Sequence, residues 1–74
     1  MNEDLIRVKI GKGIAGLRAD KGMTQGELAD LVNVDRYQIS RLELGKRNIT
    51  IIPLRNIINA LNSNLSDFFK SVDL

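Results

Sequence analysis

One side of a short helix predicted between positions 35 and 44 could contact a polyanion. Four polar side chains share that side: Arg36, Tyr37, Ser40 and Arg41. Two apolar residues, Ile39 and Leu42, point nearly the opposite way, because successive helical residues turn by about 100°. Guanidinium groups can bind phosphate or a guanine edge, and hydroxyls can reach either. The helix therefore suits DNA, although taken alone it favours the plainer interpretation of an ordinary solvated surface.

Positive charge is concentrated around this helix. The chain has 74 residues and a net charge of +2, which is too small to indicate a partner. Between positions 36 and 55, however, five basic residues stand against a single acidic one, Glu43, and the rest of the chain is net acidic. A local basic patch on a nearly neutral protein is typical of a surface that binds a polyanion.

The composition argues against catalysis and metal binding. The sequence contains no cysteine and no histidine, which excludes disulfides, thiolate metal sites and the commonest general base. No spaced cluster of carboxylates indicates a metal site or an acid–base pair. We therefore expect no enzyme activity, no catalytic residue, no metal and no cofactor.

The length and the hydropathy pattern bound the organisation of the chain. The length suits a single domain over residues 1–74. No apolar run approaches the ~20 residues that span a bilayer, and the first ten residues carry acidic groups early, unlike a signal peptide. We expect a cytoplasmic protein without a membrane contact.

Five helices are predicted, and each start has a recognisable signal. The first runs from about Leu5 to Lys21, with an apolar residue every three or four positions; its three glycines could allow a neighbouring helix to approach or could simply weaken it. The other four begin at polar residues that can cap a helix: Thr24, Asp35, Thr50 and Asn64. Glu27 completes a capping box with Thr24, and Gln38 stands at the same position relative to Asp35.

The ends of the helices and the core follow from the same pattern. Residues that tolerate a left-handed backbone stand at the expected ends and in the joint between the second and third helices: Gly22, Asn33, Gly45 and Asn62. The apolar positions of the last four helices predict an aliphatic core closed by Phe68 or Phe69: Leu28, Ala29, Val32, Ile39, Leu42, Leu54, Ile57, Ile58, Leu61 and Leu65.

The chain resembles the Cro/CI-type (XRE-like) helix-turn-helix DNA-binding domains from about Ile10 to Phe69. The resemblance is carried by three segments in the family's order and spacing: LRADKGMTQGELADLVNV, ISRLELGKRN and ALNSNLSDFF. It implies an all-α, compact, five-helix, lambda-repressor-like fold with the helix-turn-helix at about 24–43. Within the family, the short form and the segments DRYQIS and ELGKRNIT are similar to controller proteins of restriction–modification systems.

The resemblance also implies roles for individual residues. The base-facing positions of the recognition helix, about 35–44, correspond to Arg36, Tyr37, Ser40 and Arg41. The positions that contact the DNA backbone correspond to Gln25, Gln38, Lys46, Arg47 and Asn48. Gln25 can also brace a neighbouring side chain, and a capping role could account for Gln38. Arg18 and Glu43 match a partly buried ion pair that joins the first helix to the third.

Three positions depart from the family's pattern. Leu44 replaces a polar residue near the DNA backbone, Ile49 replaces a common proline, and Ser63 replaces an apolar residue. We expect one phosphate contact fewer, a slightly different entry into the fourth helix and a looser last turn. None of these positions lies on the predicted recognition surface.

The resemblance implies a transcriptional regulator that binds a palindromic operator in double-stranded DNA as a homodimer. Helices four and five are the expected dimer seam, because apolar residues beyond those of the core gather there: Ile52, Leu65, Phe69, Val72 and Leu74. The alternative is an antitoxin-like or bridging protein-interaction module of the same fold, whose apolar surface binds a toxin or another regulator.

Overall fold

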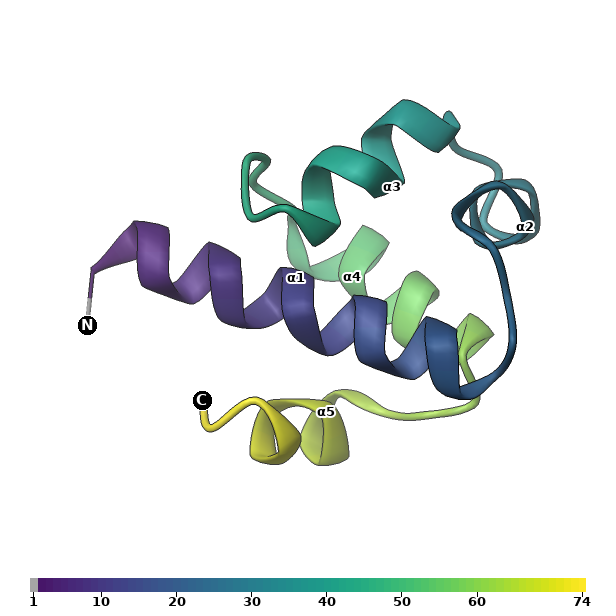
Figure 1. The fold of residues 1–74 in the computed structure, drawn as a ribbon. Helices are drawn as coiled ribbons and strands as arrows, with labels where there is room; N and C mark the ends of the chain where they lie inside the picture. The colour runs from purple at the N-terminus through teal and green to yellow at the C-terminus, as the bar shows by residue number, and fades with distance from the viewer. Residues whose placement is uncertain (1) are drawn as a thin grey trace.

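The computed structural model describes residues 2–74. In this range the chain forms five helices and no strand: α1 (Glu3–Asp20), α2 (Gln25–Leu31), α3 (Arg36–Glu43), α4 (Ile51–Ala60) and α5 (Leu65–Ser71). The predicted all-α fold with five helices is confirmed. The long α1 crosses the middle of the molecule, with α3 on one side and α5 on the other, and α2 is packed against α3 (Figure 1).

Capping at the helix starts follows the sequence with three differences. The α1 helix begins at Glu3, earlier than expected, because the Asn2 side chain accepts a hydrogen bond from the Leu5 amide at 2.7 Å. The predicted capping box of α2 is present, with both reciprocal bonds between Thr24 and Glu27 formed. Thr50 stands at the N-cap position of α4 with an extended backbone, but its side chain makes no capping hydrogen bond.

The Asp35 cap is the third difference. The Asp35 carboxylate accepts a hydrogen bond from the Tyr37 amide at 2.8 Å, one residue before the capping-box position. Gln38 is consequently not engaged as a capping-box partner, and its side chain is used elsewhere. The predicted cap of α5 is confirmed, since the Asn64 side chain accepts from the Asp67 amide at 2.9 Å.

Four left-handed residues end the first four helices in the same way. Each has a positive φ of between 58° and 73°: Gly22, Asn33, Gly45 and Asn62. The amide of the following residue bonds to the carbonyl five positions earlier, as Lys46 does to Arg41 at 3.0 Å and Met23 does to Arg18 at 3.1 Å. These paired backbone bonds satisfy carbonyls that a helix end would otherwise leave free. The predicted stops are therefore confirmed.

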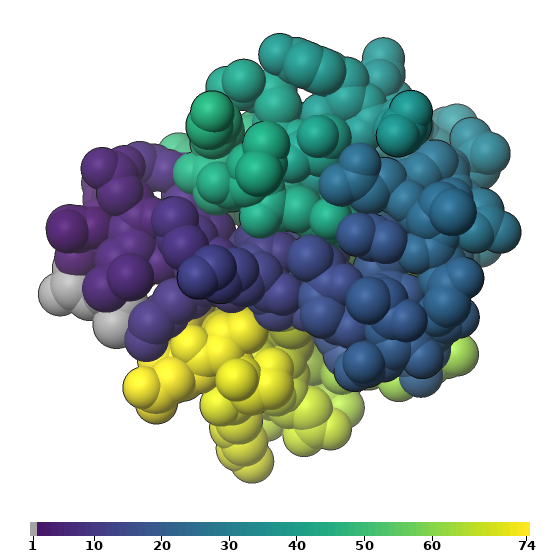
Figure 2. All heavy atoms as spheres, in the orientation of Figure 1, coloured from purple at the N-terminus to yellow at the C-terminus, as the bar shows by residue number. Residues whose placement is uncertain are grey.

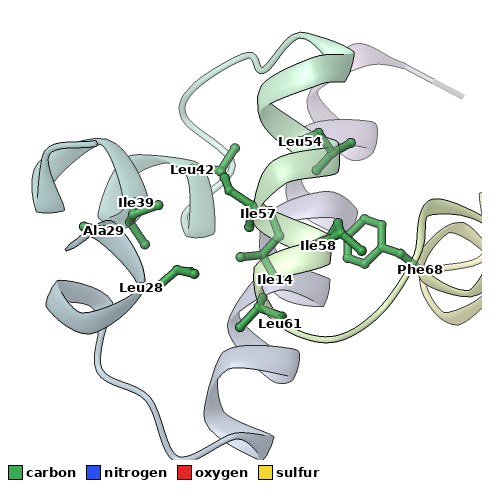
Figure 3. Packing of buried hydrophobic residues seen from close by; sticks show 10 residues of the cluster. All are labelled: Ile14, Leu28, Ala29, Ile39, Leu42, Leu54, Ile57, Ile58, Leu61 and Phe68. Atoms are coloured by element: carbon green, nitrogen blue, oxygen red, sulfur yellow. The ribbon is translucent and has the colours of Figure 1, made fainter. Parts of the chain in front are cut away.

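The core gathers side chains from all five helices around α1 and α4 (Figure 3). Ten apolar residues are fully buried: Ile14, Leu28, Ala29, Ile39, Leu42, Leu54, Ile57, Ile58, Leu61 and Phe68. Phe68, and not Phe69, is the aromatic residue that closes the core. Val32 and Leu65 lie at its edge and are only partly buried.

The close approach of α1 to α3 depends on Gly11. A β-carbon at this buried position would stand 2.6 Å from the Glu43 carbonyl oxygen and closer still to that of Leu42, far inside van der Waals contact. Gly16, on the same helix, has no such neighbour within 4 Å. Only the first of these two glycines is required for α3 to lie directly on α1.

Candidate nucleic-acid interface

The two sides of α3 differ as the helical wheel predicts. Ile39 and Leu42 are each 1% exposed and anchor the helix to the core. On the outer side Arg36 is exposed and Tyr37 is 66% exposed, while Ser40 and Arg41 are half-buried. In Figure 2, α3 and the loop after it form one border of the molecule. The structure thus brings the four predicted base-facing residues together on one accessible surface.

Arg41 is held in place on this surface by two contacts. Its guanidinium carbon lies 5.7 Å from the centre of the Tyr37 ring, a cation–π distance. One of its terminal nitrogens donates a hydrogen bond to the Lys46 carbonyl oxygen at 3.1 Å. The side chain therefore links the outer surface of α3 to the loop that follows it.

Arg36 occupies the opposite end of α3, beside the start of α2. A shallow depression in the surface is lined by Gln25, Asp35, Arg36, Tyr37 and Ser40. The first turns of α2 and α3 therefore open onto the same hollow, in which Gln25 is half-buried and Arg36 is exposed. A DNA strand that followed this hollow would meet both helices.

The loop after α3 presents its three predicted phosphate-binding residues to solvent. Lys46, Arg47 and Asn48 are all exposed. Arg47 donates a hydrogen bond to the Gln38 side-chain oxygen at 3.1 Å, so Gln38 connects α3 to this loop. Gln38 is itself half-buried, and its contact with DNA remains a prediction.

Glu43 is fixed on the inner side of the motif by three hydrogen bonds. Arg18 donates to its two carboxylate oxygens at 2.7 and 3.0 Å, and the Gln25 amide donates at 2.9 Å. The Glu43 side chain is 6% exposed and that of Arg18 is 18% exposed. The predicted ion pair between α1 and α3 is present, and Gln25 braces it.

The same hydrogen bonds favour the charged form of Arg18. Its hydrogen bond to Glu43 raises the pKa of Arg18 further above its ordinary value, against the opposing effect of burial. A second bond joins Arg18 to the Met23 carbonyl at 2.7 Å. Glu43 is thus paired with Arg18 inside the protein and forms no ion pair with the cations on the outer side of α3.

Two residues of α1 belong to this surface and escaped the sequence analysis. Arg7 and Asp4 line an open depression together with Arg41, Gly45, Lys46 and Asn48. A signal for Arg7 existed in the sequence: it precedes Arg18 by eleven residues, about three helical turns, and so shares its side of α1. Since Arg18 was expected to face α3, Arg7 could have been placed beneath the end of that helix.

The structure revises the apolar residues of the expected seam between α4 and α5. Leu65, Phe69 and Val72 pack against the core and are only partly exposed. Ile52 remains 64% exposed, with Ile51 beside it at 55%, and Leu74 is 46% exposed. The apolar surface that α4, α5 and the residues after them leave exposed therefore lies at the start of α4 and at Leu74.

Two of the three positions that depart from the family's pattern differ in exposure. Leu44 is 62% exposed at the end of α3, whereas Ile49 packs against the core.

Within the described residues, no helix is both long and apolar enough to cross a bilayer. The same range contains no group of three side chains able to hold a metal ion.

The motif and its surroundings match a known family. Residues 14–68 correspond to the helix-turn-helix family HTH_3. The chain belongs to this family. Among curated proteins, the helix-turn-helix chain is 30% identical over 69 residues to the control protein C.MunI of a Mycoplasma species, covering 92% of this chain and 93% of that protein. The family resemblance drawn from the sequence is thereby confirmed.

Solved structures agree with the fold of this helix-turn-helix chain. The restriction–modification controller protein C.Esp1396I is 36% identical, with a TM-score of 0.84, over 99% of this chain and 92% of that one. The same protein, at a TM-score of 0.83, has been solved as a tetramer in complex with its natural 35-base-pair operator. The clp gene regulator ClgR of Corynebacterium glutamicum is 30% identical, with a TM-score of 0.87, over 90% of this chain and 71% of that one.

Proposed function

We propose that this chain is a transcriptional regulator that binds DNA in a sequence-specific way. The observation that carries the proposal is the division of α3, whose apolar side is buried while Arg36, Tyr37 and Arg41 stand on its outer side. A single helix of this kind fits the major groove, where arginine can bind guanine through two hydrogen bonds. Neither catalysis nor a cofactor forms part of this function.

The surrounding residues position the recognition helix on the duplex. Lys46, Arg47 and Asn48 bind phosphates beyond the end of α3, and the start of α2 crosses the backbone at the other end. Gln25 combines a phosphate contact with its bond to Glu43. Contacts of this kind fix the orientation of the protein but carry no sequence information themselves.

The regulator acts as a homodimer on a palindromic operator. Two recognition helices related by a two-fold axis read half-sites about 34 Å apart, one turn of DNA, and a protomer of 32 × 23 × 21 Å is small enough for that spacing. The exposed Ile51 and Ile52 at the start of α4, together with Leu74, supply apolar surface for a seam. The operator-bound tetramer of C.Esp1396I supports an assembly of several protomers on DNA. We place the regulator in the cytoplasm as part of this proposal.

Selection of bound fragments from random duplex DNA tests the proposal. A palindromic consensus with half-sites one turn apart is expected, and binding to it should fall steeply with salt. With about three or four phosphate contacts per subunit, the log–log slope for a dimer should be roughly −5 to −7.

Two results of this selection would contradict the proposal in whole or in part. Failure to enrich any sequence, combined with a stable complex with a protein partner in gel filtration, would favour the protein-interaction module. An enriched sequence without internal symmetry would retain DNA recognition but contradict the homodimer.

A further inference from the structure

The beginning of α1 forms part of the cationic surface beside the recognition helix. Arg7 and Asp4 line one open depression with Arg41, Lys46 and Asn48. Arg7 also borders a second depression with Arg47 and Asn48. The residue therefore adjoins the whole 46–48 loop, which the proposed function assigns to phosphate. In Figure 2 the first turns of α1 lie directly beside that loop.

A close backbone contact fixes this arrangement. Gly45 has a φ of +73°, and a β-carbon there would stand 2.9 Å from the Cα of Val8. The loop after α3 thus rests on the backbone of α1 at the residue next to Arg7. The contact between α1 and Gly45 therefore keeps Arg7 beside the loop.

Positive charges outnumber negative ones in the depression that Arg7 shares with Arg41 and Lys46. Arg7, Arg41 and Lys46 are cationic, and Asp4 alone is anionic. Asp4 forms an ion pair with Arg7 one helical turn away, with the carboxylate side chain 87% exposed and the Arg7 side chain 25% exposed. An exposed pair of this kind contributes little to stability. It leaves the guanidinium free to exchange the carboxylate for a more strongly charged ligand.

We propose that Arg7 is an additional DNA-phosphate contact, made from α1, and that Asp4 is its counter-ion in the free protein. This inference rests on the proposed function, because it extends the phosphate contacts of the 46–48 loop. The contact falls on the backbone beyond the end of α3 and does not read bases. Asp4 limits its strength, since the carboxylate must give up Arg7 and then lies near the phosphate.

Four variants test the inference on a fluorescently labelled duplex of mixed sequence. Arg7→Gln removes the contact and Asp4→Asn removes the counter-ion. Lys12→Gln is the matched control, since it removes one charge from the same helix at an exposed residue that borders α5 instead. Lys46→Ala reports whether the proposed interface is used at all. Circular dichroism confirms that each variant is folded.

Arg7→Gln should weaken binding, with a log–log salt slope less steep by about 0.9 for each bound protomer. Across a roughly fourfold rise in salt, its disadvantage relative to the natural protein should therefore shrink about threefold per protomer. Asp4→Asn should strengthen binding at low salt, a gain that partial unfolding cannot produce. Lys12→Gln should leave the slope unchanged.

Four results would overturn the inference. Equal salt slopes for Arg7→Gln and Lys12→Gln would mean that Arg7→Gln acts only by lowering the net charge of the protein. Weaker binding by Asp4→Asn would contradict the role of Asp4 as a counter-ion. If Lys46→Ala weakens binding and Arg7→Gln does not, the α1 contact is wrong while the proposed interface stands. If neither variant changes affinity, the proposed interface itself is wrong.

Discussion

The junction between α1 and α3 and the outer side of α3 use similar charged groups in different ways. At the junction, Glu43 is enclosed by hydrogen bonds from Arg18 and Gln25 and is almost fully buried. On the outer side, no carboxylate of residues 2–74 forms an ion pair with Arg36, Arg41 or Lys46. Charges that are paired inside the protein orient the helix, and those left without a carboxylate are available to a polyanion. Stability and recognition should therefore respond to different substitutions.

Glu43→Ala should have the largest effect on stability. Removing the carboxylate leaves Arg18 half-buried without its partner, at a cost of about 2–4 kcal/mol, somewhat below a fully buried pair because Arg18 keeps some exposure. Thermal denaturation should show a melting temperature lower by roughly 10 °C or more. Asp30→Ala, which removes an exposed carboxylate from α2, is the control. An unchanged melting temperature for Glu43→Ala would mean that the pair is not buried in solution.

Gly11→Ala should destabilise the same junction by about 1–3 kcal/mol, because the new methyl group overlaps the carbonyls at the end of α3. Gly16→Ala places a methyl group in open space on the same helix and should stabilise the protein by about 0.5–1 kcal/mol. Urea denaturation of both variants measures the difference. Equal changes in the two unfolding free energies would show that contact with α3 does not require a glycine.

Arg41→Ala tests the outer side, where the expected loss is in binding. Selected operators should be bound about 1–3 kcal/mol more weakly, with relaxed preference at one base position. The melting temperature should change little, since the hydrogen bond of Arg41 to Lys46 is exposed. Arg55→Ala, at an exposed position of α4, is the control in competition assays with single-base operator variants. Equal losses on operator and random DNA would show that Arg41 does not read a base.

Lys46→Ala should have the smallest effect and no sequence dependence. Loss of one phosphate contact per protomer should weaken operator and random DNA alike and lower the salt slope by about 0.9 per protomer. Titrations at several salt concentrations measure this directly. A loss confined to the operator would mean that the loop takes part in base recognition.

The sequence predicted local features more completely than distant contacts. Helix ends such as Gly45 and caps such as Asn64 depend on neighbouring residues, so their residue types are enough to predict them. The helical wheel likewise placed Arg36 and Ile39 on opposite sides of α3, because the turn of about 100° per residue alone determines which side a helical residue faces. Without the family resemblance, the pairing of Arg18 with Glu43 would have remained invisible.

What the sequence missed arises between elements that are far apart in the chain. Close approach of a neighbouring helix was one of two interpretations for the glycines of α1, but only the path of the α3 backbone shows that Gly11 is the one that lies against α3. Arg7 likewise enters the surface only because Gly45 rests on α1. Thr50 shows the reverse limit: a residue of suitable type stands at the N-cap position, yet its side chain makes no capping bond. The roles of the individual surface residues toward DNA stay predictions.

The two contacts that hold Arg41 have a further consequence. An arginine side chain has several rotatable bonds, and ordering it at an interface costs conformational entropy. The Tyr37 ring and the Lys46 carbonyl restrict those rotations before any ligand arrives. Much of the ordering therefore accompanies folding, and less remains to oppose association. Arg41 is preorganised, and each of its bonds to DNA should yield more net affinity than an equivalent bond made by Arg36, whose guanidinium forms no hydrogen bond or ion pair within residues 2–74.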